Sequence, residues 1–311
     1  MSPGGGHAES ATKVRSRPPP LTKVHDRFVI SRGLAAHATW DEATADPLEG
    51  QAQHRGSVST GSRARPASGR VVSRPRLLLV PEFTEVQWTI RPLLEAWADV
   101  ASYDPPGVGQ EPPVARLDRG AIAERGVEEI DRRGWDSCVV VADGWAIAAA
   151  IRIAASDPTR VAGLALGHAR LSDRTEGPHA AMNKEVYAAL SELIANTPRS
   201  FIRHGIVQST GGSVDEDVAE AMIQRFPSEL IQAGWEQLTR PEEFADDLRA
   251  LAVPMLLAKH EGCLMNTEEG YDEAVAAFPD AVTTATPNAC CVDPGFAQAL
   301  RSFCAEVEAS A

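Results

Sequence analysis

The sequence predicts an α/β protein built on a doubly wound, mostly parallel sheet, with a helical subdomain inserted late in the chain. Three observations lead to this prediction. From residue 76 onward, short apolar runs alternate with amphipathic stretches. The apolar runs are short and continuous, as in strands that are buried on both faces. Residues 168–252 show no strand character but contain several stretches of helical spacing. Alternation of strands and helices is typical of a parallel sheet covered by helices.

The strands are predicted from apolar runs without a polar alternation. The strongest run is SCVVVAD, which ends at Asp143 and is rich in β-branched residues. The predicted sheet strands cover residues 76–80, 99–104, 137–143, 161–167 and 253–259. Residues 27–30 and 35–40 are predicted to be further extended chain before them.

The helices are predicted from their apolar spacing and their end signals. Residues 121–133 carry acidic residues early and arginines late, which complements the helix dipole. The predicted helices cover residues 90–97, 121–133, 146–158 and 299–308, with 185–195, 214–225 and 228–238 in the insertion. We expect the insertion, about residues 170–248, to form a lid over the ends of the strands, where doubly wound folds place their sites.

The chain before the sheet differs in composition from the rest. Residues 1–25 are rich in Gly, Pro, Ser and Arg and show no periodicity, so we expect them to be disordered. Residues 26–311 are predicted to form one domain, with a flexible polar loop at about 42–73.

Composition excludes several classes of function. The net charge of −13 argues against nucleic acid as a partner, since phosphate contacts need clustered Lys and Arg. No apolar run reaches the length of a membrane span or a signal peptide, which predicts no membrane partner. The cysteines form no CxxC pair, so we expect neither a zinc ribbon nor a thioredoxin-type site, and their odd number fits a reducing cytoplasm. We predict no metal and no other cofactor. Frequent Ala and Arg indicate a bacterial source.

Three segments of the sequence resemble the α/β-hydrolases over about residues 76–311. The segment YDPPGVGQEPP resembles the family's D-x-P-G-x-G-x-S turn, with Asp104, Pro106, Gly107 and Gly109 in place. Residues 139–169 match the family's strand, G-x-S-x-G elbow, small-residue helix and following strand without a gap, and residues 247–263 resemble the entry to a late strand. The resemblance implies the α/β-hydrolase fold, while function has to be argued from the site.

The elbow matches the family in length but not in its nucleophile. It reads Ala142, Asp143, Gly144, Trp145 and Ala146. The resemblance places Gly144 at the serine position, and Gly has no side chain with which to attack. Trp145 takes the next position, whose backbone N–H helps to form the oxyanion hole in the family. We therefore expect no classical serine hydrolase.

The base and acid of the triad are altered as well. His260 is the last histidine of the chain, and Asn288 lies near the position of the family's catalytic histidine. Asn cannot act as a general base near neutral pH. Cys263 lies closest to the position of the acid, with Glu261 nearby.

The loop that supplies the oxyanion hole also departs from the family. Pro81 and Glu82, followed by Phe83, replace the usual His-Gly pair. A carboxylate there opposes the stabilisation of a developing negative charge, which needs hydrogen-bond donors. The predicted ligand-binding residues are Pro81, Glu82, Phe83, Asp143, Gly144, Trp145, His168, Cys263 and Asn288.

Several residues keep two interpretations. Asp143 is an aspartate nucleophile, as in the haloalkane dehalogenases, if the alignment shifts by one residue; otherwise it caps the following helix. Glu82 and Asp143 form either a carboxylate pair that does acid–base work or two solvated loop acids. His168, oriented by Asp173, is either a catalytic residue or a structural one. Cys290 and Cys291 are either nucleophile candidates or packing residues.

Three hypotheses about function follow. The first is a protein that binds a small, partly apolar molecule without hydrolysing it. The second is a lyase, isomerase or cyclase that uses Asp143, Glu82 or His168 for proton transfer on a bound substrate. The third is a conventional or aspartate-nucleophile hydrolase that the alignment misplaces. Each has a small molecule as the partner.

Overall fold

The computed structural model describes most of the chain after residue 73. The described residues are 74–82, 88–109, 111–112, 114, 117–171, 244–261 and 268–310, with parts of the stretch 188–238. The predictions for residues 1–25, 27–30, 35–40 and 42–73 lie outside the described residues.

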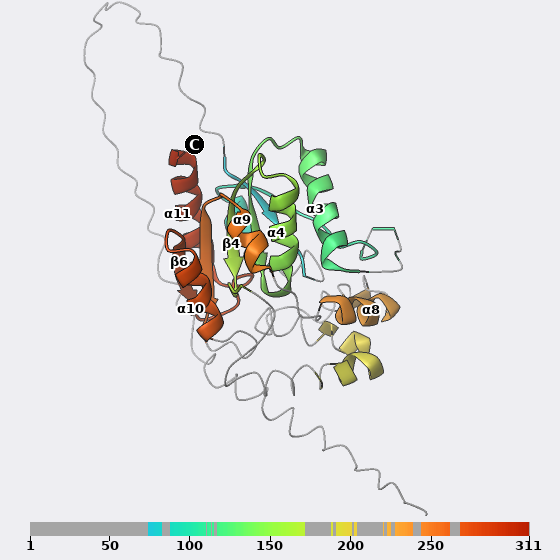
Figure 1. The fold of residues 1–311 in the computed structure, drawn as a ribbon. Helices are drawn as coiled ribbons and strands as arrows, with labels where there is room; N and C mark the ends of the chain where they lie inside the picture. Colours follow the sequence, from blue (N-terminus) through green and yellow to red (C-terminus); the bar gives the residue numbers. More distant parts are fainter. Residues whose placement is uncertain are drawn as a thin grey trace, which may run out of the picture. The chain divides into compact units, whose positions relative to one another are not determined.

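The described strands form a six-stranded sheet, and its strands are parallel, which confirms the predicted sheet type (Figure 1). The strands are β1 (Arg76–Leu79), β2 (Asp99–Ser102), β3 (Cys138–Asp143), β4 (Val161–Gly167), β5 (Met255–His260) and β6 (Val282–Thr286). Their order in the sheet is β2-β1-β3-β4-β5-β6. The strand order reverses between β1 and β3, so that the carboxyl ends of these two strands lie at a switch point.

The sequence missed β6 at one edge of the sheet. Its residues read VTTAT and alternate between partly buried and exposed positions up to the buried Thr286, so they lack the continuous apolar run that marks the other strands. The preceding helix α10 (Glu268–Ala277) was missed too, because its apolar face is narrow and Ala274 is its buried residue. An edge strand is covered less completely than a central one, which weakens its sequence signal.

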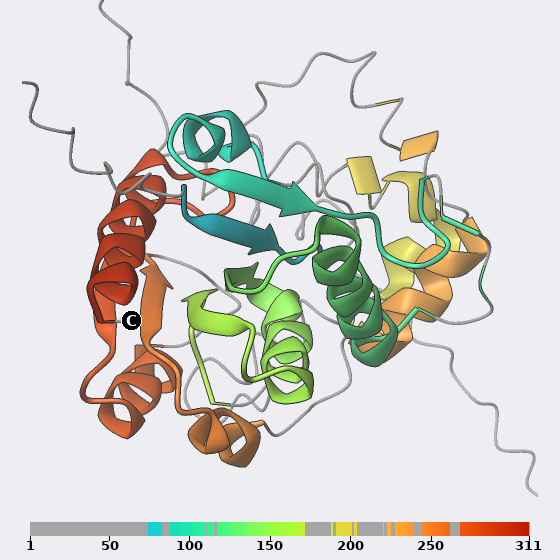
Figure 2. The same cartoon turned by 90° about the horizontal axis from the view of Figure 1, so that it is seen from above.

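Helices cover both faces of the sheet, and each face has its own core (Figure 2). The described helices are α2 (Arg91–Glu95), α3 (Arg119–Arg133), α4 (Ile147–Ser156), α8 (Ser228–Leu238), α9 (Ala245–Ala250), α10 and α11 (Pro294–Ser310). Side chains of α2 and α11 pack on one face, while α3, α4, α9 and α10 pack on the other. Helix α11 begins earlier than the predicted residues 299–308, since it already starts at Pro294.

Helix α3 shows how the sequence sets the ends and packing of a helix. Asp118 accepts a hydrogen bond from the Ala121 N–H at its start, and Gly134 ends it at φ 61°. Between these ends, Gly126 lets α3 approach its neighbours closely. A Cβ at this position would lie 2.6 Å from the Cδ1 of Ile153 in α4 and 2.7 Å from the hydroxyl of Tyr103.

The stretch predicted as a lid is described only in part. Helix α8 coincides with the predicted residues 228–238, and helical turns at 191–196 overlap the end of the predicted 185–195. Buried apolar residues of α8, such as Leu230 and Ile231, join the core on the α3 and α4 face. That this stretch acts as a lid stays a prediction. None of the described helices is long and apolar enough to cross a membrane.

Candidate functional site

The candidate site lies at the carboxyl ends of the central strands. Because all described strands are parallel, the segments that follow them meet at one edge of the sheet. Glu82 follows β1, Gly144 follows β3, and His168 follows β4, while His260 ends β5. Glu82 and Gly144 lie on the two sides of the switch point, which is why residues far apart in the sequence come together there.

The elbow has a backbone conformation that favours glycine. Asp143 is the last residue of β3, and residues Gly144–Ala146 form a single 3-10 turn that leads into α4. Gly144 has φ 58°, in the left-handed region. Gly144 therefore stands at the sharp turn, and Asp143 precedes it within the strand. This placement favours the alignment in which Gly144 has the nucleophile position.

The Glu82 carboxyl occupies the space beside Gly144. Its Oε1 accepts a hydrogen bond of 2.5 Å from the Trp145 N–H. A Cβ built on Gly144 would lie 2.0 Å from the same oxygen. Glu82 thus fills the place of a side chain at position 144. It also accepts a hydrogen bond from the backbone amide that, in α/β-hydrolases, helps to form the oxyanion hole.

Burial and charge raise the pKa of Glu82. The residue is partly exposed, but its carboxyl group is enclosed by neighbours, and this desolvation raises its pKa from 4.5 to about 7. The negative charge of the nearby Asp143 raises the pKa of Glu82 further. The hydrogen bond from the Trp145 N–H and the charges of His168 and Arg170 lower it in part. Glu82 therefore changes its charge near neutral pH, and it is not one of two solvated loop acids.

Asp143 begins a chain of hydrogen-bonding side chains. Its Oδ1 contacts the Nδ1 of His168, and its Oδ2 accepts a hydrogen bond of 3.2 Å from the Cys291 N–H. The Nε2 of His168 lies 3.0 Å from the Nδ1 of His260. Burial disfavours the Asp143 carboxylate, but the charge and hydrogen bond of His168 outweigh it and hold the pKa of Asp143 below its usual range.

The interpretation of Asp143 as a helix cap is wrong. Its side chain makes no hydrogen bond to the first turn of the following helix. Both of its oxygens bond elsewhere, to His168 and to the Cys291 N–H. Gly167 makes room for this arrangement, since a Cβ there would lie 2.5 Å from Asp143 Oδ1.

Arg170 connects the elbow to the segment after β4. Its guanidinium donates to the Gly144 carbonyl at 3.0 Å and to the His168 carbonyl at 3.1 Å. His168 itself has φ 53°, a conformation that non-glycine residues adopt rarely and at a cost. Sequence reasoning did not single out Arg170, although it lies two residues after His168. It named His260 only as the last histidine of the chain and gave it no role.

The segment after β6 supplies backbone and packing rather than a base. Asn288 is exposed, and its side-chain amide donates to Asp293 at 3.1 Å. Cys290 and Cys291 are buried, and burial raises the pKa of both thiols well above the usual value. A thiol that stays protonated is a poor nucleophile, so their burial fits the packing interpretation.

An aromatic pair lies on the other side of the elbow. The rings of Trp145 and Trp235, the latter on α8, meet edge to face with their centroids 5.2 Å apart. The indole N–H of Trp235 donates to the Ser191 hydroxyl at 2.8 Å. Gly144 therefore lies beside the polar groups of Glu82 and Arg170, and the next residue, Trp145, carries an apolar ring that packs on Trp235.

The remaining predicted residues divide into two groups. Pro81 is buried just before Glu82. Phe83, Asp173 and Cys263 lie outside the described residues. Among the described residues, Asp143 has the role at His168 that the sequence analysis gave to Asp173.

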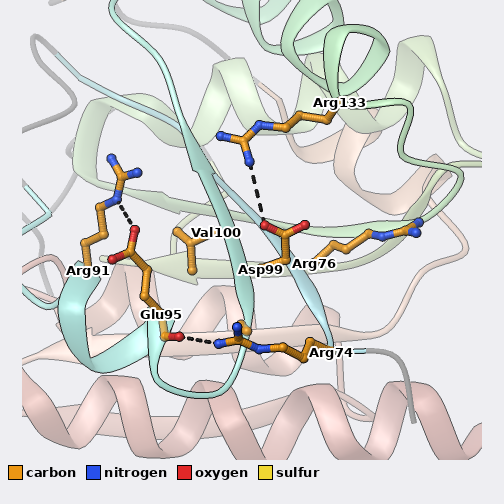
Figure 3. Close-up of a pocket in the computed structure, with 8 residues that line it drawn as sticks. Arg74, Arg76, Arg91, Glu95, Asp99, Val100 and Arg133 are labelled. Carbon is orange, nitrogen blue, oxygen red and sulfur yellow. Dashed lines mark hydrogen bonds and ion pairs between the residues drawn. The ribbon is translucent and has the colours of Figure 1, made fainter. Parts of the chain in front are cut away.

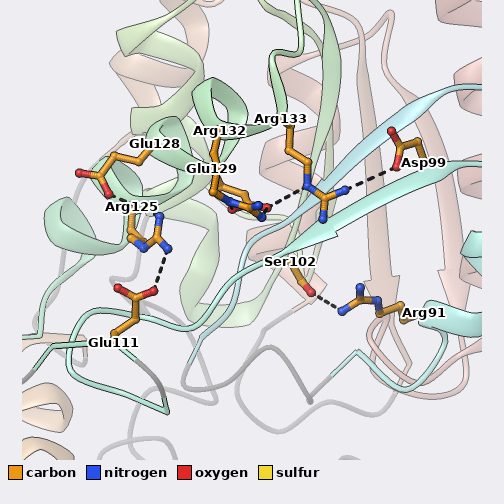
Figure 4. A network of polar contacts seen from close by, with 9 residues as sticks. All are labelled: Arg91, Asp99, Ser102, Glu111, Arg125, Glu128, Glu129, Arg132 and Arg133. Carbon is orange, nitrogen blue, oxygen red and sulfur yellow. Dashed lines mark hydrogen bonds and ion pairs between the residues drawn. The ribbon is translucent and has the colours of Figure 1, made fainter.

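A second polar feature lies at the opposite ends of the strands (Figure 3). It is a shallow cleft of about 660 Å³, lined by Arg74, Arg76, Arg91, Glu95, Ala98, Asp99, Val100 and Arg133. Arg91 pairs with Glu95 at 2.8 Å and Arg133 with Asp99 at 3.6 Å. Figure 4 shows the Arg133 pair within a wider network along α3. Arg76 pairs with Asp136, and Arg74 donates to the Glu95 carbonyl, so the cleft has the character of a surface ion-pair network.

In the part of the chain that the structure describes, no group of His, Cys, Asp and Glu has an arrangement that could hold a metal ion.

Comparisons with solved structures identify the fold. No family model and no curated protein matches the sequence. A putative epoxide hydrolase from Pseudomonas aeruginosa is 19% identical, with a TM-score of 0.60 over 76% of this chain and 90% of that one. A haloalkane dehalogenase variant from Bradyrhizobium elkanii is 18% identical, with a TM-score of 0.58 over 78% and 92%. A malate-bound esterase from Thermogutta terrifontis is 20% identical, with a TM-score of 0.57 over 76% and 90%.

Proposed function

Because the chain has the α/β-hydrolase fold, we propose that it uses the position of that fold's active site to bind a small, partly apolar molecule without hydrolysing it. The observation that carries the proposal is the contact between Glu82 and the elbow. The Glu82 carboxyl accepts the Trp145 N–H and leaves no room for a side chain at position 144. A hydrolase of this fold needs both the nucleophile and the anion hole.

The polarity of the site supports a ligand with two different ends. The Trp145 N–H, which donates to Glu82, and the Arg170 guanidinium, which donates to the Gly144 carbonyl, make one side of the site polar. The Trp145 ring, packed on Trp235, offers an apolar surface beside them. Small-molecule sites commonly combine an apolar wall with a few polar groups that fix the orientation of the ligand.

Methyl hexanoate, a neutral ester, tests this proposal in one sample. Saturation-transfer NMR reports its binding, and the methanol signal reports its hydrolysis. We expect saturation transfer without release of methanol, and a loss of transfer in Trp145→Ala. Trp97→Ala is the matched control, because Trp97 packs on the opposite face of the sheet. Protein-dependent methanol release, or no binding at all, would contradict the proposal.

A second candidate function is acid–base catalysis without a covalent intermediate. Two observations favour it: the pKa of about 7 at Glu82, and the chain of contacts from Asp143 through His168 to His260. A carboxyl group with a pKa near the working pH is suited to accept and return a proton. Turnover of a carbonyl substrate that Glu82→Gln abolishes while its binding persists would identify this function.

A further inference from the structure

The position of Glu82 also indicates which kind of ligand the elbow accepts. Its carboxyl group lies against the Trp145 N–H, with its Oε1 where a side chain at position 144 would begin. This segment follows β1, whereas the elbow follows β3, so the contact joins residues that are distant in sequence. The structure therefore holds a carboxyl group in the anion hole of the elbow.

Burial and the charge of Asp143 disfavour a negative charge on this carboxyl group, and two neighbours offset them in part. The Trp145 amide donates a hydrogen bond to it, and the charge of Arg170 stabilises the ionised form. Arg170 is fixed in place by its bonds to the carbonyls of Gly144 and His168. Asp143 does not compete for the Trp145 amide, because its two oxygens contact His168 and the Cys291 N–H.

The residues around the hole lie at the edge of the core. Glu82, Gly144, Trp145 and His168 are each partly exposed, whereas the strands behind them are buried. Glu82 lies in the segment after β1, outside regular secondary structure. A side chain there can leave the hole without breaking the hydrogen bonds of the sheet.

We propose that the space beside Gly144 is a binding site for the carboxylate of a small acid with an apolar tail, and that Glu82 is an internal ligand that such an acid displaces. This inference rests on the proposed function and adds the chemical class of its ligand. The carboxylate of the acid accepts the Trp145 N–H near Arg170, and its tail lies along the Trp145 ring. An internal competitor lowers the apparent affinity by the fraction of time that the hole is open.

The test compares hexanoate with hexanamide, which has the same tail but no charge. Affinities are measured by calorimetry for the wild type, Glu82→Ala and Glu82→Gln. We expect the affinity for hexanoate to rise at least about tenfold in Glu82→Ala, because the competitor is removed. The Gln side chain still accepts the amide hydrogen bond, so its effect is smaller. Hexanamide also gains affinity in Glu82→Ala, because the same hole is opened, but it binds more weakly than hexanoate in each variant, since it carries no charge for Arg170 to attract.

Glu306→Ala is the matched control, since Glu306 is exposed on α11 and its removal changes the net charge by the same amount. If Glu306→Ala also tightens hexanoate, the effect is long-range charge and the inference is wrong. It is also wrong if Glu82→Ala binds hexanoate no better than the wild type does. If Glu82→Ala binds hexanoate no better but methyl hexanoate still binds the wild type, the proposed binding function stands and only the carboxylate site is wrong. If none of the three probes binds, both fail.

Discussion

At the scale of single residues, the Glu82 carboxyl leaves no room for a side chain at position 144. Gly144 has φ 58°, and a Cβ there would lie 2.0 Å from the Glu82 Oε1. Gly134 has φ 61° with nothing near the position of its Cβ. A substitution at either glycine therefore costs free energy because of the left-handed backbone. Only a substitution at Gly144 also clashes with Glu82.

The pair gives a direct prediction. Gly134→Ala should cost about 1 kcal/mol of unfolding free energy, from the left-handed backbone alone. Gly144→Ala should cost about 1–3 kcal/mol more, because Glu82 has to move. In a Glu82→Ala background the two costs should become equal. Urea unfolding measures all of these variants, and an equal cost in the wild-type background would show that Glu82 leaves the hole freely.

Asp143 gives a second prediction at this scale. Asp143→Asn removes the charge that His168 contacts within a buried site, and should cost about 1–3 kcal/mol. Asp131→Asn is the control, because Asp131 is exposed and its pair with Arg160 lies at the surface. A surface pair contributes about 0–1 kcal/mol. Equal losses in urea unfolding would mean that the contact with His168 adds no stability.

Sequence reasoning could name Glu82, Gly144 and Trp145, which meet at the elbow, but not their contacts. The resemblance placed Gly144 at the nucleophile position and Glu82 in the neighbouring loop. It could not reveal that the Glu82 carboxyl reaches the Trp145 N–H, because a side chain contact between two loops depends on strand order and register. Arg170 was missed for the same reason, since it acts on backbone carbonyls and belongs to no motif.

At the scale of elements, the contact between α3 and α4 depends on a glycine within a helix. Alanine normally stabilises a helix interior relative to glycine by roughly 0.5–1 kcal/mol. At Gly126 the added Cβ would lie 2.6 Å from the Cδ1 of Ile153. We therefore expect Gly126→Ala to destabilise the protein by about 1–3 kcal/mol.

Ile153→Val tests the cause, because it deletes the Cδ1 atom. The double variant should lose less stability than the sum of the two single variants. Thermal unfolding followed by circular dichroism gives the comparison. Additive losses would place the conflict at Tyr103 instead, whose hydroxyl is the other near atom.

The elements themselves were predictable where burial is complete. The runs that became β1, β3 and β4 are almost entirely buried, so their residues are continuously apolar. Strand β6 alternates with exposed positions, and α10 is mostly exposed, so neither produced a clear signal. The strand order depends on long-range pairing, which local sequence patterns do not encode.

At the scale of the whole molecule, stability should depend on pH through Glu82. Its pKa is about 7 in the folded protein and 4.5 by default. Folding therefore disfavours its ionisation, and this contribution to stability is present below about pH 4.5 and is lost as the pH rises through 7. The charged and titratable groups that face Glu82 are Asp143, His168, Arg170 and Cys291.

Glu82→Gln isolates this effect. We expect the variant to be more stable than the wild type at pH 8, by about 1–3 kcal/mol, and close to it at pH 4.5. The low pKa of Asp143 gives the opposite trend, but that contribution is lost only below the pH range compared here. A difference that does not change between these pH values would rule out the titration of Glu82 in this range.

The overlap between Glu82 and position 144 also restricts the order in which this site can change over generations. A serine at position 144 meets the carboxyl oxygen as long as Glu82 stays in place, so that substitution alone harms folding and provides no usable nucleophile. A loss of the Glu82 side chain is tolerated first, because it empties space instead of filling it. The easiest route between a serine elbow and this one therefore passes through a form that has glycine at position 144 and lacks the Glu82 side chain.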